Sequence, residues 1–244
     1  PKLAQAFVRR AELLAEAGRL QEALEDVARA IQLEPNQYRH FWLRAAVKQR
    51  LGRTREALPD VEKALSLKPE EVELLILRAE ARLGLDDLNG ALEDLQAATG
   101  RNPRLVRPRV LRAQIFSRKG DHKKAAELTA AISLSPQDPQ IYFLRGLSNE
   151  AMGLHEPAVE DFSEAIHLRP DDYLAYFNRG LIHIRMGQPD KAVEDLSRAL
   201  WVKADFAEAY VQRGVAFSRQ KQHARAVEDF SLGLKLRPDS PHVY

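Results

Sequence analysis

Residues 158–162 read AVEDF, and the same five letters return at residues 226–230. Halfway between them, residues 192–196 read AVEDL, so neighbouring copies begin 34 residues apart, at 158, 192 and 226. A pentapeptide that returns at a constant spacing indicates one structural unit repeated along the chain.

Seven copies of this unit can be aligned, at a period of 34 residues with one interval of 33. They are expected at residues 4–37, 38–71, 72–105, 106–138, 139–172, 173–206 and 207–240. Within each copy, apolar residues recur at three- and four-residue steps on both sides of a central break, which is typical of two amphipathic helices. Five copies have Gly at this break, and six have Pro near their end, where it stops a helix. The sequence therefore predicts an all-α chain of seven helical hairpins.

The small residues of each copy occupy fixed places. The eighth place is Ala or Gly in all seven copies, the twentieth is Ala, and the fourth is Tyr or Phe in five. With a period of 34, this pattern resembles the tetratricopeptide repeat (TPR), and it covers essentially the entire chain. The resemblance implies a single array over residues 1–244. It also implies a right-handed superhelical solenoid whose first helices line a concave groove, while the second helices lie on the convex side.

Charged residues also repeat. In six copies an Arg at the seventh place precedes an Asp by 16 residues, and these pairs are Arg10/Asp26, Arg44/Asp60, Arg78/Asp94, Arg145/Asp161, Arg179/Asp195 and Arg213/Asp229. We expect each pair to bridge the two helices of its hairpin, as an exposed ion pair that contributes about 0 to 1 kcal/mol. The alternative is that the arginines form a ladder that binds a ligand. The fourth copy is one residue short, and the Asp is the residue it lacks.

Both ends of the sequence are in phase with the repeat. Pro1 lies 34 residues before Pro35, and residues 241–244 supply the first four places of a further copy. We therefore expect a segment cut from a longer array, because natural arrays carry terminal caps. The last hairpin would then leave Phe230 and Leu234 without a covering neighbour, and self-association through the exposed array ends is expected.

Composition and motifs exclude several classes of function. The net charge is +2, there is no Cys, and no membrane span or secretory signal is visible. The compartment stays open, with the cytoplasm favoured. No phosphate-binding loop, nucleophile elbow or metal-binding helix is found, and His183 is expected to be packed rather than to bind a metal. We expect no catalytic residue, no metal and no cofactor.

The resemblance directs attention to the groove. Its family places predict that a protein or peptide segment is bound by residues of repeats five to seven: Phe143, Leu147, Phe177, Asn178, Leu181, Ile184, Arg185, Val211, Val215 and Arg219. The favoured function is a noncatalytic protein–protein interaction scaffold or adaptor. A competing interpretation is that the aliphatic members pack against the next repeat and belong to the core.

A basic run distinguishes the fourth copy. Between residues 101 and 124 there are nine Lys or Arg and one acidic residue, Asp121. The candidate basic patch consists of Arg101, Arg104, Arg107, Arg109, Arg118, Lys119, Lys123 and Lys124. One alternative function is therefore the binding of RNA or another polyanion, although the period and the lack of polar base-reading pairs make nucleic acid the less favoured partner. Another is the regulatory arm of an enzyme whose catalytic domain lies outside this sequence.

Overall fold

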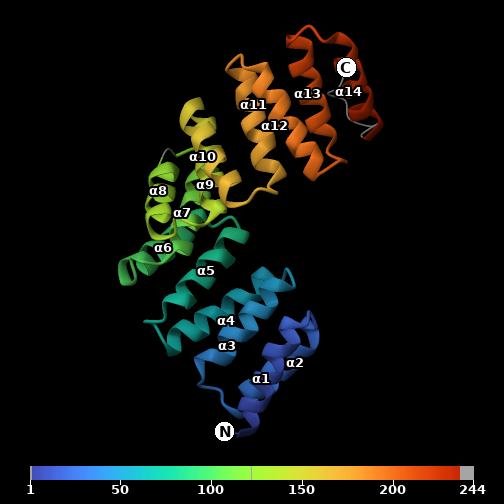
Figure 1. Ribbon diagram of the computed structural model, residues 1–244. Helices are drawn as coiled ribbons and strands as arrows, with labels where there is room; N and C mark the ends of the chain where they lie inside the picture. The colour runs from blue at the N-terminus through green and yellow to red at the C-terminus, as the bar shows by residue number, and fades with distance from the viewer. Residues whose placement is uncertain (1, 122, 237–244) are drawn as a thin grey trace. The chain divides into compact units, whose positions relative to one another are not determined.

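The computed structural model describes residues 2–121 and 123–236, and only the backbone of residues 123–125. In this described part all regular secondary structure is α-helical, in fourteen helices (Figure 1). They are α1 (Lys2–Glu16), α2 (Leu20–Leu33), α3 (Tyr38–Arg50), α4 (Thr54–Leu67), α5 (Val72–Gly84), α6 (Leu88–Arg101), α7 (Val106–Arg118), α8 (Lys123–Leu134), α9 (Pro139–Ala151), α10 (His155–Leu168), α11 (Tyr173–Arg185), α12 (Pro189–Val202), α13 (Ala207–Arg219) and α14 (His223–Leu236).

Helix boundaries follow the repeat. The first helix of each copy from the second to the seventh begins at the first residue of the expected repeat, from Tyr38 to Ala207, and α1 begins two residues earlier than expected. Each hairpin packs mainly against the hairpins before and after it. The prediction of an all-α helical repeat solenoid is confirmed.

The helices form two compact units, and each is described by itself. Residues 1–118 form the first unit with α1–α7, coloured blue to green in Figure 1. Residues 119–244 form the second unit with α8–α14, coloured yellow-green to red. None of the helices in the described ranges combines the length and apolar composition needed to cross a bilayer.

The turn inside each hairpin requires a left-handed backbone conformation. The five glycines at this place have φ between 66° and 77°, as expected. In the third and seventh copies the same place is Asp86 (φ 63°) and Lys221 (φ 62°), which adopt this conformation despite having a Cβ. The turn geometry is therefore set by the fold even where the residue disfavours it.

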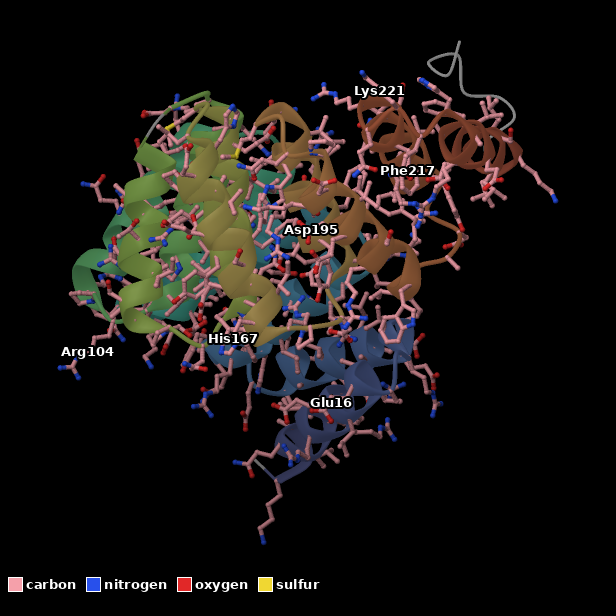
Figure 2. The ribbon with its side chains drawn as sticks, turned by 45° about the horizontal axis from the view of Figure 1, so that its top comes forward. Glu16, Arg104, His167, Asp195, Phe217 and Lys221 are labelled. Atoms are coloured by element: carbon pink, nitrogen blue, oxygen red, sulfur yellow. The ribbon has the colours of Figure 1, made fainter. Side chains whose placement is uncertain are left out.

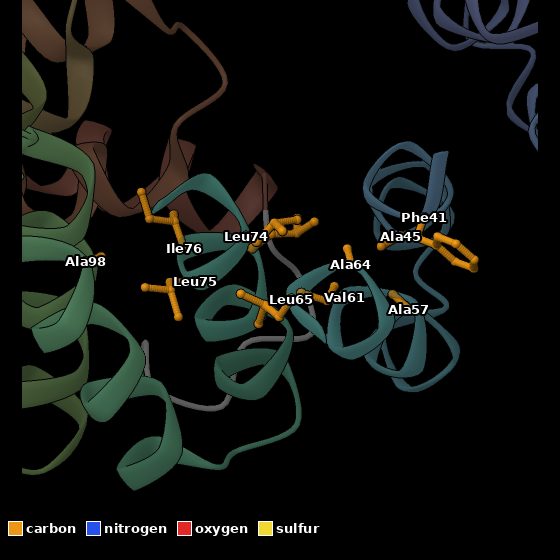
Figure 3. Close-up of a cluster of buried hydrophobic side chains, with 11 residues drawn as sticks. Phe41, Ala45, Ala57, Val61, Ala64, Leu65, Leu74, Leu75, Ile76 and Ala98 are labelled. Carbon is orange, nitrogen blue, oxygen red and sulfur yellow. The ribbon is translucent and has the colours of Figure 1, made fainter. Parts of the chain in front are cut away.

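Small residues allow the two helices of each hairpin to approach closely. In the first unit, Ala45 on α3 and Val61 on α4 are both fully buried and belong to the cluster drawn in Figure 3. In the second unit the corresponding residues are Gly146 and Phe162. A Cβ on Gly146 would lie 3.0 Å from the Phe162 ring, so glycine makes room for the larger partner. In these two hairpins the smaller residue at the eighth place accompanies the larger residue 16 positions later.

Candidate functional site

The six Arg–Asp pairs form as the sequence predicts. Each Arg Nε donates to a carboxylate oxygen of the Asp 16 residues later, at distances from 2.5 to 3.0 Å. They are not exposed pairs, however, because the Asp side chains are only 3–6% exposed (Asp195 is labelled in Figure 2). The expected contribution of about 0 to 1 kcal/mol, which applies to an exposed ion pair, is therefore too small for these pairs. Removing the Arg would leave a buried carboxylate without its partner.

Four of these Asp residues have a second neighbour that the sequence analysis missed, at the eleventh place of the repeat. Lys48 donates to Asp60 at 2.8 Å, Arg82 to Asp94 at 2.9 Å, and the Asn149 amide to Asp161 at 2.8 Å. His183 lies near Asp195, with Nε2 3.7 Å from the carboxylate, and its Nδ1 is 2.9 Å from the Gln188 amide oxygen. Burial lowers the pKa of His183, which supports its expected role as a packed residue.

In the second unit the arginines also join neighbouring repeats. Arg179 Nη1 donates to the Ser163 hydroxyl at 2.9 Å, and Arg213 Nη1 to the Ser197 hydroxyl at 3.1 Å. Arg145 makes the equivalent bond to Thr129 at 3.2 Å. Each of these arginines thus holds its own Asp and a hydroxyl of the preceding repeat. This arrangement makes the arginines structural and leaves no basis for the ligand ladder.

Repeats five to seven present the predicted groove residues from α9, α11 and α13. Leu147, Leu181, Val211 and Val215 are half-buried. So are the two aromatic candidates, Phe143 and Phe177, and each contacts a neighbouring ring. The Phe143 and Phe162 centroids are 5.6 Å apart, and those of Phe177 and Phe206 are 4.7 Å apart. These side chains share their surface between packing and solvent, so they are neither fully in the core nor fully exposed.

Ile184 differs from the other candidates. It is only 6% exposed and packs with Leu200 and Ala209, so it belongs to the core between the sixth and seventh repeats. Its inclusion among the groove residues is corrected, because a side chain without exposed surface cannot contact a partner. The twelfth place of the repeat, which Ile184 occupies, ranges from buried at Ile184 to exposed at Ser218.

The polar groove candidates already have partners within the chain. Asn178 donates from its amide to the Leu174 carbonyl at 2.7 Å, and Arg185 forms an ion pair with Glu150. Arg219 donates to the Ile184 carbonyl, which bears no charge. Of the two arginines expected to meet an acidic group, Arg185 is neutralised by a carboxylate, whereas the bond described for Arg219 leaves its charge intact.

A cavity adjoins one aromatic candidate. Phe143 lines a hollow of about 270 Å³ together with Gln140, Tyr173 and Leu174, between α9 and the start of α11. Arg169, Asp171 and Asp172 complete its wall.

Three arginines of the basic run lie near carboxylates of the preceding repeat. Arg107 donates to the Glu80 carboxylate at 2.8 and 2.9 Å, and Arg101 and Arg118 lie 3.8 and 3.7 Å from Glu70 and Asp86. Arg109 donates to the Pro103 carbonyl at 3.3 Å, while Arg104 and Lys119 are exposed. The side chains of Lys123 and Lys124 lie outside the described residues. The excess charge counted along the sequence is therefore reduced by carboxylates one repeat earlier.

The first unit contains a pocket that the predicted site did not include. It has a volume of about 270 Å³ and is lined by eight residues: Val8, Glu12, Tyr38, Arg39, Trp42, Leu43, Glu71 and Glu73. The available signal was Trp42, the only Trp at the fifth place of any copy. Within residues 2–121 and 123–236, no group of three or more His, Asp or Glu is arranged to hold a metal ion.

Comparisons with known proteins agree with this architecture. Two family models described as tetratricopeptide repeat match residues 4–37 and, in overlapping segments, residues 43–241. A search of the curated proteins gave no match.

Solved structures share the fold at low identity. The C-terminal part of a TPR repeat-containing protein from Cytophaga hutchinsonii matches with a TM-score of 0.79 and 16% identity, over 97% of both chains. A tetratricopeptide repeat protein from Parabacteroides merdae matches with a TM-score of 0.72 and 19% identity, over 100% of this chain and 96% of that one. YrrB, described as a TPR protein with an unusual peptide-binding site, matches with a TM-score of 0.64 and 17% identity, over 73% and 93%. The matched repeats span nearly the whole sequence, and the chain therefore belongs to the tetratricopeptide repeat family.

Proposed function

We propose that this chain is a noncatalytic scaffold that binds a segment of a partner protein along the first helices of repeats five to seven. TPR proteins generally mediate protein–protein interactions, and YrrB is described as binding peptide. The observation that carries the proposal is the row of half-buried apolar side chains on α9, α11 and α13. Phe143, Phe177 and Val211 occupy the fifth place of consecutive repeats.

The first helices are close enough to form one surface. α11 contacts both α9 and α13 directly, so side chains at the same repeat place on these helices are neighbours. Large aromatic residues with part of their surface free are common anchors of binding energy. Phe177 is held by the Phe206 ring and therefore loses little freedom when a partner covers it.

The charge of Arg219 gives the proposed surface an orientation. Its guanidinium is at the end of α13 and is exposed, and its hydrogen bond goes to a carbonyl rather than a carboxylate. An acidic group on the partner could form an ion pair with the Arg219 guanidinium. A charge at the rim of an interface acts mainly on the association rate, in a manner that depends on salt.

The test begins with a photo-crosslinking amino acid at position 181, between Phe143 and Val215 along the proposed surface. The same label at position 201 provides the control, because Trp201 is 75% exposed on the second helix of its repeat. A partner captured from position 181 but not from position 201 is then titrated against variants. We expect Phe177→Ala to weaken binding by about 1 to 3 kcal/mol.

Two further variants make the test specific. Glu16→Ala, on α1 in the first repeat, should leave affinity unchanged, and Arg219→Gln should slow association mainly at low salt. Phe177→Ala must be shown to remain helical and to unfold near the wild-type urea concentration. Equal affinity of wild type and a folded Phe177→Ala would contradict the proposed surface. A stronger loss from Arg104 or Lys119 substitutions would instead favour the basic patch and the polyanion alternative.

A further inference from the structure

The pocket beside Trp42 in the first unit is lined by four apolar or aromatic residues. Val8 comes from α1, and Tyr38, Trp42 and Leu43 come from α3. Trp42 is 36% exposed, although the residue at the same place of the next repeat, Ile76, is 1% exposed. Packing between repeats is therefore satisfied by an aliphatic side chain, and does not explain why the second repeat holds a half-exposed indole.

Three carboxylates line the same pocket as these apolar residues. Glu12, Glu71 and Glu73 line the pocket, and Arg39 is the one cation among its lining residues. Three carboxylates and one guanidinium give the lining a net charge of −2, although the whole chain has a net charge of +2. The pocket is thus an acidic and aromatic site on a slightly basic protein.

The three carboxylates are not equally available. Glu71 accepts hydrogen bonds from Lys68 at 2.5 Å and from the Tyr38 hydroxyl at 3.2 Å, and these partners lower its pKa. Glu73 is 54% exposed, with Arg107 at the edge of ion-pair range, 4.0 Å away. Glu12 is 35% exposed and accepts from Arg9, whose side chain is 77% exposed, so this pair is a surface ion pair that contributes little binding energy. Glu12 and Glu73 therefore have capacity for another cation.

We propose that this pocket receives the side chain of a Lys or Arg residue in a partner segment. The aliphatic stem of such a residue would lie against Val8 and Trp42, and its cationic head would approach Glu12 and Glu73. Long basic side chains bury their stems on apolar surface in this way, and a Trp face attracts a cation more strongly than other rings do. An acidic side chain would be repelled, and a neutral apolar one would remove the carboxylates from water without compensation.

The inference rests on the proposed function only in that the ligand is a protein segment. It concerns a different unit of the chain and a different partner residue. The two proposals can therefore fail independently, and the experiment below uses a local reporter of the first unit.

Trp42 itself supplies that reporter. The chain has two Trp residues, so Trp201→Phe leaves Trp42 as the sole source of indole fluorescence. This variant of the full chain is titrated with acetylated and amidated hexapeptides of Ala and Ser that differ only at one central residue: Arg, norleucine or Glu. We expect the Arg peptide to change Trp42 emission and to bind about fivefold more tightly than the norleucine peptide. That difference should shrink between about 50 mM and 500 mM NaCl, and the Glu peptide should not bind.

Matched variants locate the charge. In the Trp201→Phe background, Glu12→Gln and Glu73→Gln should each weaken binding of the Arg peptide about threefold. Each substitution removes one negative charge, and an ion pair at a partly exposed position contributes only modestly. Glu16→Gln changes the same charge on the same helix outside the pocket, and should have no effect. In the reciprocal Trp42→Phe variant, the emission of Trp201 should not respond to any peptide.

Three results would overturn the inference. They are an Arg peptide that leaves Trp42 emission unchanged, a norleucine peptide that binds as tightly as the Arg peptide, and equal effects of Glu12→Gln and Glu16→Gln. None of them bears on the surface around Phe177, whose test uses a captured partner. Conversely, a selective response of Trp42 would stand even if Phe177→Ala left partner binding unchanged.

Discussion

Replacing Asp161 by Ala should strongly destabilise the fifth repeat, because this carboxylate is the common acceptor of two side chains. Arg145 donates to it from Nε at 3.0 Å and from Nη2 at 2.6 Å, and Asn149 donates from its amide at 2.8 Å. The Asp161 side chain is 3% exposed and Asn149 is 8% exposed. The substitution would therefore leave the Asn149 amide without its acceptor at a position with little exposed surface.

The magnitude follows from what remains unpaired. A buried amide without an acceptor costs about 1 to 3 kcal/mol, and loss of a hydrogen bond to a charged group costs about 1.5 to 3 kcal/mol. The guanidinium of Arg145 is 25% exposed and keeps its bond to Thr129, so it can be partly hydrated. The total should therefore lie below the roughly 5 kcal/mol of a fully buried broken pair. Ala also favours a helix by about 0.5 kcal/mol over Asp. We expect a net loss of about 3 kcal/mol.

The neighbouring residue provides the control. Glu160 precedes Asp161 in the same pentapeptide and helix but is exposed, so Glu160→Ala should change stability by less than about 0.5 kcal/mol. Because repeat arrays need not unfold in one step, urea unfolding should be combined with hydrogen exchange of the α9 and α10 amides. If Asp161→Ala costs no more than Glu160→Ala by both measurements, the buried pair does not stabilise the hairpin and our account of the repeated AVED motif is wrong.

Three further outcomes are expected. Lys221→Gly should raise the free energy of unfolding by about 1 kcal/mol by relieving a left-handed conformation, whereas Gly153→Ala should lower it by a similar amount; urea melts in which Lys221→Gly is destabilising or Gly153→Ala is stabilising would refute this. His183→Asn should reduce the loss of stability on acidification. Burial lowers the pKa of His183 in the folded state. Below about pH 6.5 this imidazole is therefore protonated more readily in the unfolded chain than in the native one, which favours unfolding. Wild type should lose more stability than the variant between about pH 7.5 and 5.5. Self-association should increase with concentration and be reduced by Val227→Lys, because Val227 is 63% exposed on α14; light scattering that shows a monomer throughout would contradict it.

The last of these predictions differs in detail from the sequence expectation. Phe230 and Leu234 were expected to be uncovered, but both are half-buried. Phe230 reaches back to α13, where a Cβ on Gly214 would lie 2.9 Å from its ring. The exposed apolar residues of α14 are instead Val227, Leu232 and Leu236. A helical pattern indicates which residues are apolar, but it does not show that a close contact with a glycine on the preceding helix buries one of them.

Features repeated in every copy were predictable from the sequence. The helices, their turns and the Arg–Asp pairs recur at fixed spacing, so seven aligned copies identify them without any structure. The second partner that four of these Asp residues have was not predictable in this way. It is Lys48, Arg82, Asn149 or His183, so the eleventh place of the repeat carries no common residue type. Only the geometry shows that these side chains share one position beside the carboxylate.

The candidate site was only partly predictable for a related reason. In a stacked array, the partner of a side chain often lies about one repeat away in the sequence. Arg107 therefore counts as part of a basic run, although Glu80, 27 residues earlier, binds it. Similarly, the fifth place predicts which side chains point toward the groove, but Ile76 is 1% exposed and Trp42 is 36% exposed at that same place. The two side chains have different neighbours, Ile76 in a buried cluster and Trp42 beside a pocket, and a single repeat does not contain that information.

The division between constant and variable places has a consequence for specificity. The Arg–Asp pairs and the small residues hold the two helices of a hairpin together, and the Asp carboxylates are almost completely buried. The fifth-place residues differ within each unit: Val8, Trp42 and Ile76 in the first, and Phe177 and Val211 in the second. Substitutions at the constant places should therefore change stability in every assay, with little effect on the choice among partners that still bind. Substitutions such as Trp42→Phe should change which segment is preferred at nearly constant stability, because the indole is part of the surface and the scaffold beneath it is intact.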